Sequence, residues 1–235
     1  MSPSPQQQRI AHVLGRNSWF ASRPKEMQDS LVQHAQVSTV SAGEWLYDTG
    51  DEAHGLYGVL SGSVMTHVVL ANGDSVPISL SGPGTIFGYA AQILRGKRIT
   101  TAIARERSEV IYVPQRAIAA IVHNMPSLWL HFAELATDQL NWAARAYAEC
   151  MRLPPLPRIA SRLYLLSFPW GAEEPIAVPL RQDELADLMG LSRKTVNRVL
   201  QELEARGLVE TGYGTIFIRN PEGLREVSAE DPETV

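Results

Sequence analysis

The fold of this chain is decided by one stretch, Leu191-Ser192-Arg193-Lys194-Thr195-Val196-Asn197-Arg198-Val199-Leu200. Gly190 allows a tight turn, and Ser192 can cap the following helix by accepting a backbone N–H hydrogen bond. Apolar residues then recur at helical spacing and predict a buried face, formed by Val196, Val199, Leu200 and Leu203. The polar side chains lie off this face, near the start of the helix. This pattern predicts the recognition helix of a helix-turn-helix, with the DNA-facing residues Ser192, Arg193, Lys194, Thr195, Asn197 and Arg198.

The segments on either side of this helix support the same interpretation. Residues 182–189 place Leu185 and Leu188 on one helical face, and Asp183 and Glu184 lie in the first turn, where the helix dipole favours negative charge. Two β-branched runs separated by glycines follow at 207–218 and predict a hairpin wing. The alternative is an amphipathic pair of helices with a solvated basic face.

The composition describes an ordinary globular protein. The chain has 235 residues, of which 45% are hydrophobic and 20% charged, and no stretch approaches the roughly 20 apolar residues of a membrane span. Its N-terminus lacks the features of a secretory signal, and a single cysteine cannot form an internal disulfide. We therefore expect a cytoplasmic protein with no membrane association. The formal net charge of −4 predicts an acidic body with a small basic DNA-binding surface.

The order of the sequence patterns predicts an α+β protein in three parts. Residues 1–8 are polar and proline-rich, and we expect them to be disordered. Residues 1–125 contain one helical region followed by short strands between glycine turns, which predicts a small barrel or β-roll of the jelly-roll type. Residues 126–151 form a long helix. Residues 152–235 begin with a proline-rich hinge and contain the winged helix-turn-helix.

The long helix is apolar on more than one side. One row approximates a heptad seam and is predicted to form a dimer interface, with Leu128, Phe132, Leu135, Gln139, Trp142 and Ala146. Other faces carry Leu130, Ala133, Leu140, Ala144 and Tyr147. One side can cover the roll while the other requires a second copy of the chain. The alternative is a core helix of a monomer.

Three segments of the chain resemble the Crp/Fnr family of bacterial transcription regulators. They are residues 42–51, residues 55–64, and the pattern Ser192-Arg193-x-Thr195-Val196-x-Arg198. The resemblance extends from about Trp19 to Asn220 and implies a cyclic-nucleotide-binding-type β-roll, a dimerisation helix and a winged helix. It also implies a homodimer on an inverted-repeat, palindromic operator of double-stranded DNA, with RNA polymerase as a candidate partner.

The resemblance assigns contacts with bases or phosphates to Arg193 and Arg198. Lys194 stands where many family members carry a glutamate. A glutamate can accept a hydrogen bond from cytosine N4, and a lysine cannot. We therefore expect an operator that differs from the common half-site of the family.

The effector region departs from the pattern of the relatives that bind cyclic AMP. Gly88 is present, but Tyr89 replaces the glutamate that contacts the ribose, and Ile99 follows Arg98 in place of Ser or Thr. This argues against ordinary cyclic AMP sensing. The candidate effector pocket consists of Gly88, Tyr89, Lys97, Arg98, Thr100 and Thr101. An anion held by Arg98 and Lys97, and a vestigial loop with solvated basic residues, both remain open.

Other cofactors and activities find little support in the sequence. One cysteine, Cys150, cannot bind an iron–sulfur cluster, and none of the six histidines is marked as a haem ligand. Cys150 is expected to be a small buried hydrophobe, with redox sensing as the alternative. No catalytic or metal site is predicted, because there is no His-x-His pair, nucleophile elbow, P-loop or dinucleotide fingerprint. A regulator without an effector and a cupin-like enzyme are the two alternatives.

Overall fold

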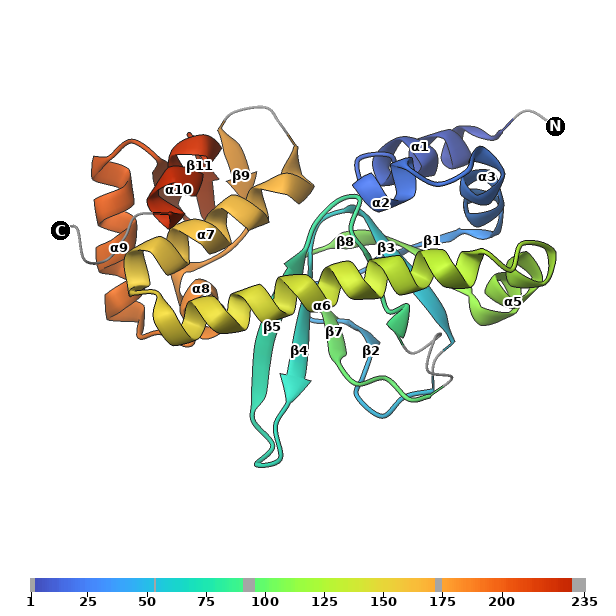
Figure 1. Ribbon diagram of the computed structural model, residues 1–235, viewed down its shortest axis with the longest axis horizontal. Coiled ribbons are helices and arrows are strands. Elements are labelled where there is room, and N and C mark those ends of the chain that lie inside the picture. Colours follow the sequence, from blue (N-terminus) through green and yellow to red (C-terminus); the bar gives the residue numbers. More distant parts are fainter. Residues whose placement is uncertain (1–2, 53, 91–95, 172–174, 230–235) are drawn as a thin grey trace. The chain divides into compact units, whose positions relative to one another are not determined.

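A computed structural model describes residues 3–52, 54–90, 96–171 and 175–229 of the chain (Figure 1). The chain forms two compact units, Met1–Asn141 and Trp142–Val235. The predicted α+β class and the sequence of β-roll, long helix and helix-turn-helix are confirmed.

The first unit contains a β-roll of two antiparallel four-stranded sheets, with strand orders β1-β8-β3-β6 and β2-β7-β4-β5. The strands are β1 (Gln36–Val40), β2 (Trp45–Tyr47), β3 (Gly55–Ser61), β4 (Val64–Val69), β5 (Ser75–Ser81), β6 (Ile86–Phe87), β7 (Thr101–Ala104) and β8 (Ser108–Pro114). Strands of both sheets contribute to one buried cluster, which includes Val59, Val64, Phe87, Ala102 and Val110. Glycine sits at the turns: Gly73, between β4 and β5, has a φ of 89°.

Three short helices precede the roll and pack on one of its sheets. They are α1 (Pro5–Leu14), α2 (Ser18–Ala21) and α3 (Lys25–His34). The expectation of disorder over residues 1–8 is wrong from Pro5 onward. The Ser4 hydroxyl accepts a hydrogen bond from the Gln7 backbone N–H, and the Gln7 side chain accepts one from the Ser4 N–H. This capping box satisfies two backbone donors at the helix start, so a polar, proline-rich segment begins a helix.

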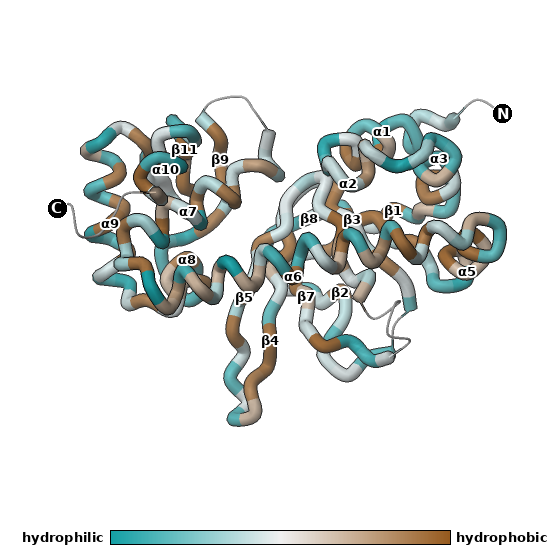
Figure 2. The backbone as a smooth tube through the Cα atoms, viewed as in Figure 1, coloured by the Kyte–Doolittle hydropathy of each residue, from teal (hydrophilic) through white to brown (hydrophobic). Residues whose placement is uncertain are grey.

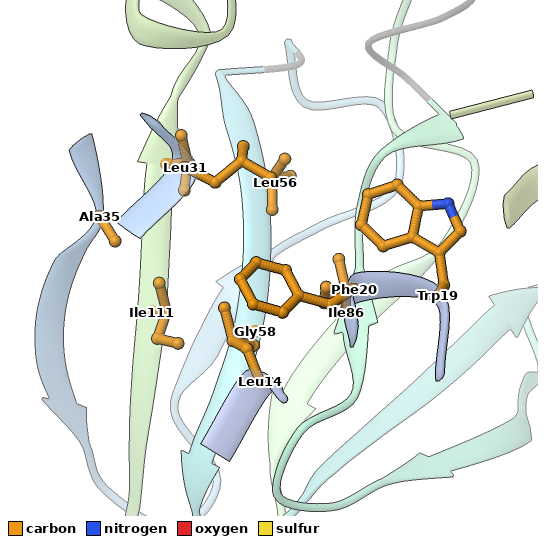
Figure 3. Close-up of a pocket in the computed structure, with 10 residues that line it drawn as sticks. Leu14, Trp19, Phe20, Leu31, Ala35, Leu56, Gly58, Ile86 and Ile111 are labelled. Atoms are coloured by element: carbon orange, nitrogen blue, oxygen red, sulfur yellow. The ribbon is translucent and has the colours of Figure 1, made fainter. Parts of the chain in front are cut away.

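The helices and the sheet enclose a small apolar pocket (Figure 3). Leu14, Phe20 and Leu31 contribute from the helices, and the strands contribute residues that include Leu56 and Gly58. Ion pairing supplements this packing at the surface, because Arg9 Nη1 of α1 lies 3.0 Å from Glu109 Oε1 of β8. The N-terminal helices are thus fixed to the roll mainly by apolar burial, supplemented by one surface pair.

Two further helices follow the roll, α5 (Gln115–Asn124) and α6 (Leu128–Arg152). Hydrophobic and hydrophilic residues alternate along α6 (Figure 2). Its first turns are fixed in the core of the first unit, where Leu128, Phe132 and Leu135 are buried. Phe132 stacks on Trp19, and the Trp19 indole N–H donates to the His131 carbonyl at 2.7 Å.

The second unit is a winged helix. Its elements are α7 (Pro155–Ser167), the 3₁₀ turn η1 (Phe168–Trp170), β9 (Ile176–Val178), α8 (Gln182–Met189), α9 (Arg193–Ala205), β10 (Val209–Gly212), β11 (Thr215–Ile218) and α10 (Pro221–Ser228). The predicted hairpin is the β10–β11 pair, and β9 extends it to a three-stranded sheet of order β10-β11-β9. The sequence patterns missed β9, which has only three residues.

Gly58 provides a test of the pocket under the N-terminal helices. A Cβ at this position would lie 3.4 Å from Leu14 Cδ2 and 3.6 Å from Ile111 Cδ1, which are ordinary contacts. We expect Gly58→Ala to raise the free energy of unfolding by about 0.5–1 kcal/mol, because it restricts the unfolded chain and adds apolar contacts. Urea unfolding followed by circular dichroism measures the change.

The matched control is Gly62→Ala. Gly62 has a φ of +80°, and a Cβ there would lie 2.8 Å from Ser108 Cα. This variant should lose more than about 1 kcal/mol, because the backbone conformation and the contact are both unfavourable. Destabilisation of similar size by both substitutions would contradict the interpretation of the pocket.

Candidate nucleic-acid interface and roll cavity

The turn before α9 has the geometry that the sequence predicts. Gly190 ends α8 in the left-handed region at φ 60°, and the Leu191 N–H donates to the Ala186 carbonyl at 2.9 Å. This closes the C-terminus of α8. The Ser192 hydroxyl then accepts a hydrogen bond from the Thr195 N–H at 3.1 Å. Ser192 therefore starts α9 as an N-cap.

Burial of one face of α9 directs its cations outward. The four predicted core residues, Val196, Val199, Leu200 and Leu203, are at most 2% exposed. Arg193, Lys194 and Arg198 are exposed, and among the residues that the structure describes no carboxylate lies within ion-pair distance of them. The first two turns of α9 thus present three positive charges that are free to meet phosphates or bases.

Asn197, a predicted contact residue, has a polar partner outside α9. Its side-chain amide donates to Gln182 Oε1 at 3.0 Å. This bond places the first residue of α8 beside the recognition helix, a neighbour that the sequence analysis missed. The adjacent Arg181 differs from the cations of α9, because its guanidinium pairs with Asp183 at 3.0 Å and with Glu184 at 3.2 Å. The Asp183 carboxylate raises the pKa of Arg181.

The wing is fixed to the base of α9. The Thr211 N–H donates to Glu204 Oε1 at 2.6 Å, and the Thr211 hydroxyl donates to the same oxygen at 2.8 Å. Beyond this anchor, Tyr213 occupies the hairpin tip between two glycines and is fully exposed. The wing therefore presents an aromatic side chain to solvent.

The roll contains a cavity of about 230 Å³. Four of the six residues predicted for an effector pocket line it: Gly88, Tyr89, Arg98 and Thr100. Sequence reasoning missed the remaining lining residues, Tyr47, Thr66, Ile78, Ser79, Ser81, Phe87, Ala90, Ile99 and Gln139. Most of these come from β4, β5 and α6, which lie far in the chain from residues 88–101.

Lys97 and Thr101 do not line this cavity, which corrects their assignment to it. Lys97 is exposed. The Thr101 hydroxyl bonds Asp48 and lies 3.1 Å from the Thr49 hydroxyl. The strand alternation explains the difference for Thr101, because neighbouring residues of an extended chain point to opposite sides.

Among the described residues that line the cavity, Arg98 carries a charge, and it is only 4% exposed. Its Nη1 donates to the Gly88 carbonyl at 2.5 Å and its Nη2 to the Gly55 carbonyl at 2.6 Å. The guanidinium carbon lies 4.3 Å from the centre of the Tyr47 ring. Arg98 thereby links Gly88, which follows β6, to Gly55, the first residue of β3.

Tyr89 lines the cavity and is also bonded to the long helix. Its hydroxyl donates to the Leu135 carbonyl of α6 at 3.3 Å. Burial raises the pKa of this hydroxyl well above its usual value, so Tyr89 stays neutral. The side chain belongs to the core cluster that holds α6 on the roll.

Comparison with known proteins identifies the family of the chain. Residues 37–125 match the cyclic nucleotide-binding domain and residues 157–227 match the Crp-like helix-turn-helix domain. The cyclic AMP receptor protein of Thermus thermophilus is 30% identical over 206 residues, which cover 87% of this chain and 93% of the relative. The chain belongs to the Crp/Fnr family.

Further similarities agree with this membership of the Crp/Fnr family. The transcriptional regulatory protein btr of Bordetella pertussis is 24% identical over 88% of this chain and 86% of its own length. A transcriptional regulator of the CRP/FNR family from Thermus thermophilus superposes with a TM-score of 0.64 at 27% identity, covering 83% of this chain and 99% of that chain. FixK2 from Bradyrhizobium japonicum shares the fold, with a TM-score of 0.73 at 20% identity over 84% of this chain and 98% of its own.

The long helix of this Crp/Fnr chain uses its faces differently from the predicted seam. Leu128, Phe132 and Leu135 are buried in their own unit, so they cover the roll and cannot meet a second chain. Gln139 lines the cavity, and the indole ring of Trp142 lies 4.5 Å from the Arg162 guanidinium carbon. Ala146 is half-buried. The dimer row predicted from the sequence is thus largely occupied within the chain.

A different row of α6 remains exposed. It has alternating spacings of three and four residues and consists of Leu130, Ala133, Thr137, Leu140, Ala144, Tyr147 and Met151. Leu130 is 62% exposed and Leu140 is 68% exposed. This spacing places the row along one face of the helix, as in a coiled-coil seam. Cys150, next to this row, is exposed, contrary to the expectation of a buried thiol.

Two other features of the described residues bear on function. Residues 3–52, 54–90, 96–171 and 175–229 contain no cluster of three histidine, cysteine or acidic side chains that could hold a metal ion. Within the same ranges, no helix has the length and apolar character needed to cross a membrane.

Two substitutions of Ser192 test whether its side chain caps α9 as a hydrogen-bond acceptor. Ser192→Ala removes the acceptor of the Thr195 N–H and should lower the free energy of unfolding of the second unit by about 1 kcal/mol. Ser192→Asp keeps an acceptor and adds a favourable charge at the helix start, so it should retain the stability. Amide hydrogen exchange in α9 measures the stability of the second unit in both variants. Equal protection in the two variants would contradict the capping role.

Proposed function

We propose that this Crp/Fnr regulator binds an inverted-repeat operator as a homodimer and inserts α9 into the major groove. The proposal rests on one observation above others: Arg193, Lys194 and Arg198 are exposed on the opposite side of α9 from its buried residues. Positive side chains on the first turns of such a helix are placed to meet base edges and phosphates. As a DNA-binding protein, the chain acts in the cytoplasm, and RNA polymerase is its expected partner at promoters.

The charge pattern supports specific binding over general binding of nucleic acid. The whole chain has a formal net charge of −4, while the cations at the start of α9 have no carboxylate within ion-pair distance in the described part of the chain. Arg193 and Arg198 can form paired hydrogen bonds with guanine O6 and N7, while Ser192, Thr195 and Asn197 provide uncharged donors and acceptors. Neutralisation of phosphates by this surface would make operator affinity fall steeply with salt concentration.

The dimer would form along the exposed row of α6, centred on Leu140. Seven residues with alternating spacings of three and four match the requirement for knobs-into-holes packing of two parallel helices. Exposed leucine, tyrosine and methionine side chains on one row are costly in water and gain free energy when a second copy covers them. A two-fold axis along α6 would place the recognition helices ~34 Å apart, facing successive major grooves.

We assign three roles to three parts of the chain. Residues 1–125 sense an effector, residues 126–151 dimerise, and residues 152–235 bind DNA. The proline-rich segment 152–157 is the hinge between the last two parts. An effector in the roll would change DNA binding only to the extent that it binds the two orientations of the DNA-binding part unequally. If no effector changes operator affinity, the chain is a regulator controlled by its own concentration.

Selection from a random DNA library tests the proposed function directly. Ligand-free full-length protein should enrich an inverted repeat whose half-sites differ from those selected by the Lys194→Glu variant. The glutamate accepts from cytosine N4 where the lysine donates, so at least one position of each half-site should change. Lys25→Glu, which makes the same charge change in α3, should select the wild-type sequence. Enrichment of no inverted repeat would contradict the proposal.

A substitution in α6 tests the dimer. Leu140→Glu places a charge in the centre of the exposed row, so sedimentation velocity should show a monomer, and operator affinity should fall at least tenfold. The matched control is Leu70→Glu, which changes an exposed leucine in the β4–β5 turn. It should remain dimeric. A dimeric Leu140→Glu protein with wild-type affinity would place the interface elsewhere.

A further inference from the structure

A side-chain hydrogen bond joins the two helices of the helix-turn-helix. The Asn197 amide of α9 donates from Nδ2 to Oε1 of Gln182, the first residue of α8, at 3.0 Å, and both side chains are half-buried. Apolar burial already packs the two helices together, because Leu185 of α8 and Val196 and Leu200 of α9 are at most 1% exposed. The effect that is particular to this bond is that it fixes the orientation of one amide on the recognition helix.

The direction of this bond decides which atoms of the Asn197 amide remain available. A side-chain amide has one acceptor oxygen and two N–H donors. Because Nδ2 donates to Gln182, the Asn197 Oδ1 and the second N–H have no partner among the described residues, and neither Oδ1 nor Nδ2 is enclosed away from solvent. A bond in the opposite direction, from Gln182 Nε2 to Asn197 Oδ1, would leave Asn197 with donors alone. Gln182 thus makes Asn197 present an acceptor together with a donor.

Asn197 lies on the face of α9 that carries exposed cations. It follows Arg193 by four residues and Lys194 by three, and residues at these spacings are neighbours on one side of a helix. Both Arg193 and Lys194 are exposed. In the proposed complex this side of the first two turns meets the major groove. The available atoms of Asn197 therefore face the same base edges as its two charged neighbours.

An acceptor beside a donor matches one base in the major groove. Adenine presents N7 as an acceptor and its N6 amino group as a donor, so it can bond both atoms of the Asn197 amide. Guanine presents two acceptors, N7 and O6, and cannot donate to Oδ1. Cytosine offers only a donor and thymine only an acceptor, so each of them bonds one atom of the amide. The orientation that Gln182 imposes on Asn197 consequently favours adenine.

We infer that Gln182 is a positioning residue that makes Asn197 read an adenine in each half-site of the operator. The inference rests on the proposed function, since it names one base of the sequence that the regulator binds. The terminal torsion of an asparagine side chain is broad and roughly two-fold, so an amide without a fixed partner presents either end. Gln182 removes this freedom before DNA binds, and the ordering cost is then not charged to the complex.

Selection from a random DNA library by variants of the full-length protein tests the inference. The wild type should prefer adenine over guanine by about tenfold at one position of each half-site, and Asn197→Ala should lose this preference. Gln182→Met has a similar length but no oxygen acceptor, so the preference at that position should fall to about threefold or less. Gln182→Glu keeps the acceptor and should keep the adenine, although repulsion of phosphates lowers its affinity for every sequence.

The matched control is Gln33→Met, which makes the same change at an exposed glutamine of α3 and should select the wild-type sequence. Thermal unfolding of every variant separates positioning from a structural role. A lower Tm for Gln182→Met, with weaker binding of all sequences and an unchanged adenine preference, would overturn the inference. A base other than adenine at the position that depends on Asn197 would also overturn it. In both outcomes the wild type still enriches an inverted repeat, whereas enrichment of none would overturn the proposed function as well.

Discussion

The anchoring of the first turns of α6 in the roll core is the constraint on which the functional surfaces of the first unit depend. Leu128, Phe132 and Leu135 are buried there, and Trp19 fixes the same turns through its hydrogen bond to the His131 carbonyl. Because these turns fix the rotation of α6 about its axis, helix periodicity also fixes the direction in which its later residues point. Gln139 then lines the cavity while remaining exposed, and the row that includes Leu140 faces outward.

The arginines of the roll cavity and of α9 lie in different electrostatic surroundings. Arg98 is buried, held by two carbonyls and an aromatic face, so its charge acts at short range in a medium of low polarity. Arg193 and Arg198 are exposed and free of carboxylates within the described part of the chain, so their charge is available to a polyanion in water.

The helix-turn-helix could be predicted residue by residue because its signals are local. The turn glycine, the Ser192 cap and the four buried residues of α9 lie within a short stretch, and their spacing is fixed by helix geometry. The effector pocket could be predicted only in part. Gly88 and Arg98 are close in the sequence, whereas Ser79 and Gln139 reach the same cavity from a hairpin and a distant helix. No local pattern indicates which alternate residues of β5 point inward.

Two apolar rows on α6 and a helix-turn-helix that contains α9 could both be predicted from the sequence alone. Helical periodicity and residue chemistry suffice for these conclusions. The three-dimensional fold was needed to learn that the row beginning at Leu128 belongs to the core of its own unit and that Arg98 donates hydrogen bonds to the Gly88 and Gly55 carbonyls. Both rows satisfy the same periodicity, and which one is buried depends on the sheet and the N-terminal helices that pack against it.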